Sequence, residues 1–87
     1  MKTTCNTERE EVERLYRLIG QNVARMRKER GMTQLDLTLA MGYKSVGLVS
    51  QAELCLNQKH FNIEHLYKIS KVLEVEMGEF FKGMEEV

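Results

Sequence analysis

Apolar residues recur at steps of three and four along two long stretches of the chain, and this spacing constrains the fold more than any other feature. One stretch runs from Val12 to Met26 and the other from Ile63 to Leu73. Such steps line one face of an α-helix with apolar side chains. No segment of useful length alternates apolar and polar residues as a half-buried strand does, and the chain has no proline. The sequence therefore predicts an all-α fold.

Stop and cap signals set the boundaries of the first two helices. Gly31 is expected to end the first helix, because glycine readily adopts the left-handed conformation found after helix C-termini. Gly20 marks either a kink in that helix or a close contact with a neighbour. Thr33 is expected to cap a second helix over residues 34–41, with Asp36 placing a favourable acid in its first turn.

Two further helices are predicted downstream. Ser45 follows a glycine turn and is expected to cap a third helix over residues 46–54, with Val49 and Ala52 facing inward. Asn62 is expected to cap a fourth helix. Its inward positions are predicted to be Ile63, Leu66, Ile69, Val72 and Leu73.

Chain length limits the organisation to one small domain. Eighty-seven residues, 43% of them apolar, can bury one core but not two. We expect a flexible acidic tail over residues 1–11 and a single domain over 12–87, with a fifth short turn at 77–81. No apolar run approaches the ~18 residues of a membrane span. The polar N-terminus is unlike a signal peptide, so we expect a cytoplasmic protein.

Charge is unevenly distributed although the net charge is zero. Residues 14–71 hold ten Lys or Arg and four acids, a net charge of +6, whereas residues 1–13 carry −2 and residues 72–87 carry −4. A basic middle segment can neutralise nucleic-acid phosphates locally. Solvated helix faces would give the same pattern, so charge alone does not decide between the two interpretations.

Motifs for catalysis, metal binding or cofactor binding are not found in the sequence. His60 and His65 are five residues apart and do not share a helix face as paired metal ligands would. Cys5 and Cys55 have no second ligand pair nearby and are expected to be reduced thiols. There is no glycine-rich phosphate loop and no nucleophile motif. We expect a protein that is not an enzyme and has no cofactor or metal.

The most informative segment lies between residues 27 and 53. It contains Arg27-Lys28-Glu29-Arg30-Gly31-Met32-Thr33-Gln34, then Leu37, Met41-Gly42 and Val49-Ser50-Gln51-Ala52-Glu53. Two short helices joined by a tight turn, here about 33–54, form a unit whose second helix fits the major groove of DNA. Over residues 19–81 the chain resembles the Cro and lambda-repressor-like helix-turn-helix family, particularly restriction–modification controller proteins and small phage-type repressors. The resemblance implies a five-helix DNA-binding domain with an N-terminal helical extension.

The resemblance also implies roles for individual residues. Gln34 would bond a DNA phosphate, and Gln51, beside Ser50, would read a base, since a glutamine can pair with adenine through two hydrogen bonds. Arg27 and Glu53 would form a partly buried ion pair between the first helix and the reading helix. Without the family pattern, both glutamines would be interpreted as ordinary solvent-facing residues. The other implied DNA contacts are Lys44, Ser45, Val46, Gly47, Asn57 and Lys59.

The sequence departs from the family pattern in four places. The turn over residues 42–45 is one residue longer than the commonest form. Val46 and Gly47 stand where polar base readers are frequent, which indicates contact with a thymine methyl group or close approach to the groove. Leu54-Cys55 replaces the usual Arg/Asn-Gly. The extension over residues 1–18 is acidic at its start and cannot act as a basic arm on DNA.

Together these features predict a sequence-specific transcriptional regulator that binds double-stranded DNA with the helix over 46–54. A single reading helix covers too short a half-site, so we expect a homodimer on a pseudo-palindromic operator. Either Phe80 or Phe81 is expected to complete the core. The expected dimer interface is formed by apolar residues late in the chain, namely Met77, Phe80, Phe81 and Met84.

Two rival functions remain open. One is an antitoxin-type autoregulator whose N-terminal extension binds a partner protein, and the other is a protein-interaction module with the same fold. Exposure of Leu15, Tyr16 and Leu18 would favour a protein partner. Leu35 and Leu39 lie off the predicted core face of the second helix and are either scattered surface leucines or part of a partner surface.

Overall fold

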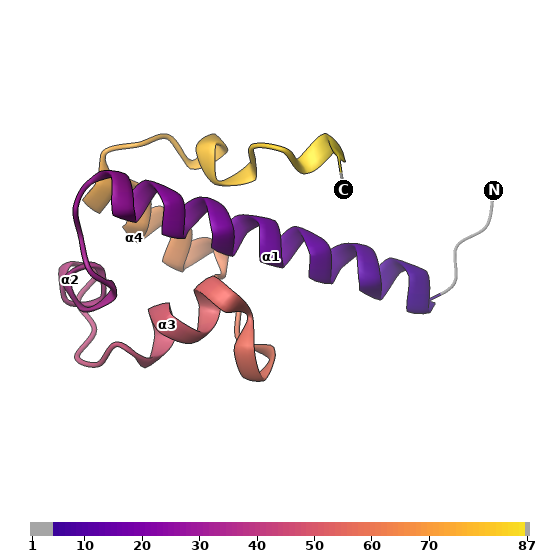
Figure 1. Cartoon of the computed structure of the whole chain (residues 1–87), viewed down its shortest axis with the longest axis horizontal. Coiled ribbons are helices and arrows are strands. Elements are labelled where there is room, and N and C mark those ends of the chain that lie inside the picture. The colour runs from indigo at the N-terminus through magenta and orange to yellow at the C-terminus, as the bar shows by residue number, and fades with distance from the viewer. Residues whose placement is uncertain (1–4, 87) are drawn as a thin grey trace.

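The structure, a computed structural model, describes residues 5–86, and every regular element in that range is helical. The predicted all-α class is therefore confirmed for this part of the chain (Figure 1). Residues 77–81 form the predicted fifth turn. The elements are α1 (Cys5–Glu29), α2 (Gln34–Ala40), α3 (Gly47–Leu54), α4 (Ile63–Leu73) and the short 3₁₀ segments η1 (Leu56–Gln58), η2 (Met77–Phe81) and η3 (Met84–Glu86).

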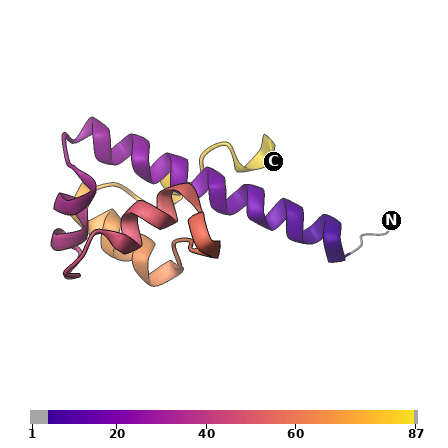
Figure 2. The same cartoon turned by 60° about the horizontal axis from the view of Figure 1, so that its bottom comes forward.

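Helix α1 is longer at its N-terminus than the sequence pattern predicted. It begins at Cys5 rather than at Val12, so residues 5–11 of the expected tail are helical, and residues 1–4 lie outside the described range. Glu8 in the first turn favours this start, because a negative charge stabilises the positive end of the helix dipole. Both views show the first half of α1 extending beyond the other helices (Figures 1 and 2).

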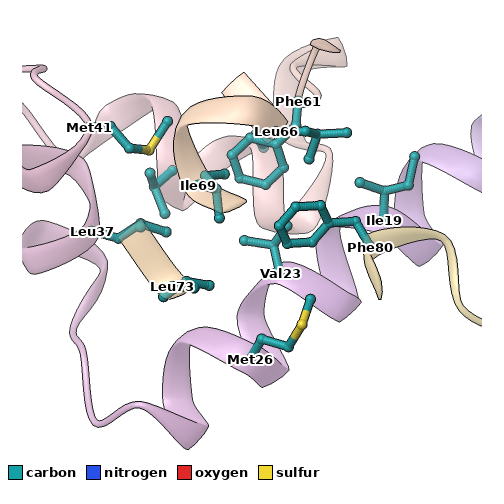
Figure 3. Close-up of a cluster of buried hydrophobic side chains, with 12 residues drawn as sticks. Ile19, Val23, Met26, Leu37, Met41, Phe61, Leu66, Ile69, Leu73 and Phe80 are labelled. Atoms are coloured by element: carbon teal, nitrogen blue, oxygen red, sulfur yellow. The ribbon is translucent and has the colours of Figure 1, made fainter. Parts of the chain in front are cut away.

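The core lies where the second half of α1 meets α2, α3, α4 and η2 (Figure 3). Leu37 of α2 and Leu73 of α4 have no exposed surface, and neither has Phe80 of η2. Phe80 is thus the phenylalanine that completes the core, and the expectation that it contacts a second chain is wrong. The other fully or nearly fully buried apolar residues are Ile19, Val23, Met26, Met41, Val49, Ala52, Phe61, Leu66 and Ile69.

Most predicted inward positions of α3 and α4 are buried, whereas Val72 is half-buried and Ile63 is exposed. Val49 and Ala52 have no exposed surface, as expected. Ile63 is 67% exposed, so its predicted inward position is wrong. Phe61, two residues before Ile63 and on the other side of the Asn62 cap, is 3% exposed and fills the core at this end of α4.

Two of the three predicted helix caps are present. The Thr33 side chain accepts a hydrogen bond from the Asp36 N–H, and the Thr33 N–H donates to Asp36 Oδ2 at 2.9 Å. These bonds hold the pKa of Asp36 below its ordinary value. Asn62 caps α4 in the same reciprocal way with His65. Ser45 does not cap α3, because the residue at that position is Val46, which makes no side-chain cap bond.

Gly20 lies where α1 crosses α3. A Cβ atom at this position would be 2.5 Å from the carbonyl oxygen of Glu53 and 2.9 Å from that of Ala52. Such distances are far inside van der Waals contact, so only glycine allows the two backbones to approach this closely. Of the two interpretations of Gly20, the structure favours a close helix contact.

Candidate nucleic-acid interface

Helices α2 and α3 pack against each other and are joined by residues 41–46. Gly42 has a φ of 96°, a conformation that other residues adopt only with strain, and it turns the chain away from α2. Leu37 and Val49 anchor the two helices in the core with no exposed surface. The pair therefore forms a fixed unit, and the turn and the start of α3 lie at its surface.

An ion pair connects this unit to α1. Arg27 Nε donates to Glu53 Oε2 at 2.7 Å, and Arg27 Nη2 donates to Glu53 Oε1 at 3.0 Å. A third donor, Arg27 Nη1, bonds the carbonyl oxygen of Met32 at 2.8 Å, across the turn that follows α1. The structure thus brings together the two residues that the family resemblance paired. Both are nearly buried, at 6% and 4% exposure, so each charge depends on the other.

Gln34 completes this network in a way that the sequence did not predict. Its Nε2 donates to Glu53 Oε1 at 2.9 Å, from the first turn of α2 to the last turn of α3. The side chain expected to bond a phosphate is therefore half-buried and engaged within the chain. Two polar residues nineteen positions apart, on different helices, give no periodic signal that could have predicted this bond.

The residues expected to read DNA lie on the turn before α3, at its first residue and in its middle. Lys44 and Ser45 are exposed, and Val46 is 37% exposed. Ser50 and Gln51 are half-buried, as is Gly47. The Ser50 hydroxyl donates to the Gly47 carbonyl oxygen at 3.2 Å, which leaves its oxygen as an acceptor. Gln51, Ser50 and Lys44 thus provide an amide, a hydroxyl acceptor and a cation within a short span.

The loop after α3 contains three residues in the left-handed conformation. Cys55, Asn57 and Gln58 have φ values of 55°, 54° and 59°, and this conformation costs roughly 1–2 kcal/mol for a residue other than glycine. Asn57 and Lys59, the expected phosphate contacts, are both exposed here. Burial raises the pKa of the Cys55 thiol, which keeps it protonated and unreactive at neutral pH.

This loop also contacts α1 through an aromatic stack that the sequence did not predict. The rings of Tyr16 and His60 lie 3.7 Å apart and are inclined by 12°. Between the first half of α1 and the loop is an open groove, whose lining includes Val12, Arg17 and Lys59. Of the three residues whose exposure was expected to reveal a partner, Leu15, Tyr16 and Leu18, each is half-buried.

The interface expected late in the chain retains few free apolar side chains. Phe80 is buried, and Met77 and Phe81 are half-buried against the core. Met84 is 38% exposed and is the largest remaining apolar contribution of the four.

Comparisons with known proteins identify no relative: no protein-family model, curated protein or solved structure matches the chain. Within residues 5–86, no helix combines the length and apolar character needed to cross a membrane. Nor do the described residues include a group of three or more His, Cys, Asp or Glu side chains placed to bind a metal ion.

Proposed function

We propose that this protein is a sequence-specific, double-stranded DNA-binding regulator that reads the major groove with α3. The observation that carries the proposal is the fixed α2–α3 unit, held to α1 by the Arg27–Glu53 pair. A reading helix must be rigidly oriented, because base contacts depend on hydrogen bonds of defined geometry. Ser50 and Gln51 supply polar groups on that helix, and the Gln51 amide can form two hydrogen bonds with an adenine.

Charge supports the same function. Exposed Lys44 and Lys59 lie before and after α3 and can contact the phosphates on either side of a groove. They belong to a segment, residues 14–71, with a net charge of +6. Gln34 takes a structural role in this proposal: it donates to Glu53 Oε1, the oxygen that also accepts from Arg27 Nη2, and so helps to fix the last turn of α3. The proposed partners are a DNA duplex, bound through its major groove, and a second copy of the chain. We propose that the protein acts in the cytoplasm and without a cofactor.

The test is selection of bound duplexes from a random DNA pool, followed by fluorescence anisotropy on the enriched site. We expect one enriched motif and steep weakening with salt, with a log–log slope of about −0.9 for each neutralised phosphate. Failure to enrich any motif, together with a flat salt response, would overturn the proposal.

A protein-interaction module is the second candidate, and one observation favours it. Leu35 and Leu39 are 47% and 54% exposed on the outer side of α2. They are four residues apart and so lie on the same face of the helix. In the selection experiment, this candidate corresponds to absence of DNA binding at low salt.

A further inference from the structure

The apolar face of α1 continues beyond the core. Ile19 and Val23 are 6% and 0% exposed, whereas Val12, on the same face, is 44% exposed. Leu15 and Tyr16, between them, are half-buried. This face therefore extends along the part of α1 that projects past α2, α3 and α4 (Figures 1 and 2). A projecting helical segment of this length has little stability of its own, since helices in water are stabilised mainly by packing.

A groove flanks this face without covering it. It has a volume of about 620 Å³ and lies between the first half of α1 and the loop after α3. One wall is Tyr16, with its ring stacked on His60 at 3.7 Å. Val12 is among the lining residues and is 44% exposed. The other lining residues are Glu8, Arg9, Glu13, Arg17, Cys55, Gln58 and Lys59.

The two ends of the groove carry opposite charge. Glu8, Arg9 and Glu13 line it toward the N-terminus of α1, and together they carry a net charge of −1. Arg17, further along α1, and Lys59, in the loop after α3, are the other charged lining residues, and together they carry a net charge of +2. A surface that is acidic at one end and basic at the other is complementary to itself about a two-fold axis, as a symmetric contact between identical chains requires.

We propose that two copies of this chain associate through residues 8–18 of α1, with the two helices antiparallel and Val12 of each copy in the groove of the other. The acidic start of one helix then approaches Arg17 and Lys59 of its partner. The proposal does not depend on DNA binding, because association is measured on the protein alone.

Sedimentation equilibrium of the full chain at micromolar concentration, without DNA, tests the pairing. We expect a dimer that Val12→Glu weakens by at least about tenfold, because the substitution places a like charge twice at the centre of the contact. The side chain is 44% exposed in the single chain, so the variant should keep the helical circular dichroism of the wild type. A wild-type chain that stays monomeric, even if it binds an unrelated protein, overturns the proposal.

Charge reversal gives a second test that folding defects cannot imitate. Glu8→Lys and Arg17→Glu should each weaken the dimer by about fivefold, and the double variant should recover most of the loss, because both charges of each intermolecular pair are exchanged. Glu11→Lys and Arg14→Glu are matched controls: both residues are exposed and neither lines the groove. A double variant weaker than either single variant, or controls that weaken the dimer equally, would contradict the model.

Met84→Glu separates this contact from one late in the chain. We expect it to leave the dimer intact. If Met84→Glu gives a monomer while Val12→Glu remains dimeric, the interface lies at η3 and the proposal is wrong.

Discussion

The α2–α3 unit and the first half of α1 differ in how far their polar groups are hydrogen-bonded and their apolar side chains are buried within the chain. In the α2–α3 unit, Glu53 accepts hydrogen bonds from both Arg27 and Gln34, and the apolar residues beneath have no exposed surface. In the first half of α1, Val12 is 44% exposed and the charged side chains line an open groove. The contrast indicates that one region is complete within a single chain, whereas the other has surface left for a partner.

The largest expected effect is a loss of folding stability when the ion pair of the α2–α3 unit is removed. Glu53→Ala leaves the Arg27 guanidinium nearly buried without its partner, and loss of one member of a buried pair costs about 3–5 kcal/mol of folding stability. Glu13→Ala, at an exposed position of α1, should change stability by no more than about 0.5 kcal/mol. Urea unfolding followed by circular dichroism measures both. Equal losses in the two variants would contradict the division into two regions.

Gly20→Ala tests the point where the two regions join. The added methyl group would lie 2.5 Å from a backbone carbonyl oxygen of α3, and relief by backbone shifts typically costs about 1–3 kcal/mol. Gly78→Ala is the control, because a Cβ there meets nothing within 4 Å. Thermal unfolding should show a lower midpoint for the first variant only; a lower midpoint for both would assign the effect to glycine replacement itself.

Substitutions in α3 and in the loop that follows it should affect DNA binding differently, because we expect α3 to contact bases and the loop to contact phosphates. Gln51→Ala is expected to cost about 1–3 kcal/mol at one base position and to relax sequence preference. Lys59→Ala should weaken cognate and scrambled duplexes alike, since a lysine contacts phosphate. Anisotropy titrations on both duplexes, with the oligomeric state checked at the same concentrations, decide the assignment. Identical behaviour of the two variants would remove α3 from the reading role.

The smallest expected effect concerns pH and the cap of α4. His65 Nδ1 accepts a hydrogen bond from the Asn62 N–H at 3.0 Å, and burial holds the pKa of His65 below 6.5, with Lys68 and His60 adding to the decrease and Glu64 opposing it. Because the folded pKa is lower than the unfolded one, the contribution to stability is complete above pH ~6.5 and is lost as pH falls through the folded pKa.

Stability measured by urea unfolding from pH 7.5 to 5 should therefore decrease. His65→Gln keeps an acceptor at the third helical position, as in a standard capping box, and should show a weaker decrease over the same range. A wild-type profile that is flat, or that rises toward acid, would show that His65 is not the group responsible.

Local features were predictable from the sequence because they depend on neighbours in the chain. The spacing of Leu66, Ile69 and Leu73 identified the buried face of α4, and Thr33 and Asn62 were recognisable caps. Ile63 shared that spacing but lies in the first turn, where Phe61 fills the core instead. Periodicity gives the face of a helix but not how far along the helix the packing extends.

Long-range pairings could not be predicted from spacing. The Arg27–Glu53 pair came from the family resemblance alone, and neither the bond from Gln34 to Glu53 nor the stack of Tyr16 on His60 has a sequence signal. The choice between Phe80 and Phe81 was undecided for the same reason: adjacent residues point in different directions, and only the position of η2 against α1 determines which is buried.

Helix α1 runs without interruption from its projecting end into the core, so its sequence length fixes the rotation between its two halves. Its 25 residues span roughly 37 Å at ~1.5 Å per residue, and Gly20 clamps it to α3 nearer the C-terminal end. No turn interrupts the helix between Val12 and Gly20, so these two residues are connected by continuous helical backbone. Inserting one residue between Tyr16 and Gly20 would rotate the outer half by about 100° relative to the clamp. Insertions in the outer half should therefore disturb the orientation of this segment relative to α3 far more than substitutions do. The length of the helix also sets the distance between the segment around Val12 and the α2–α3 unit.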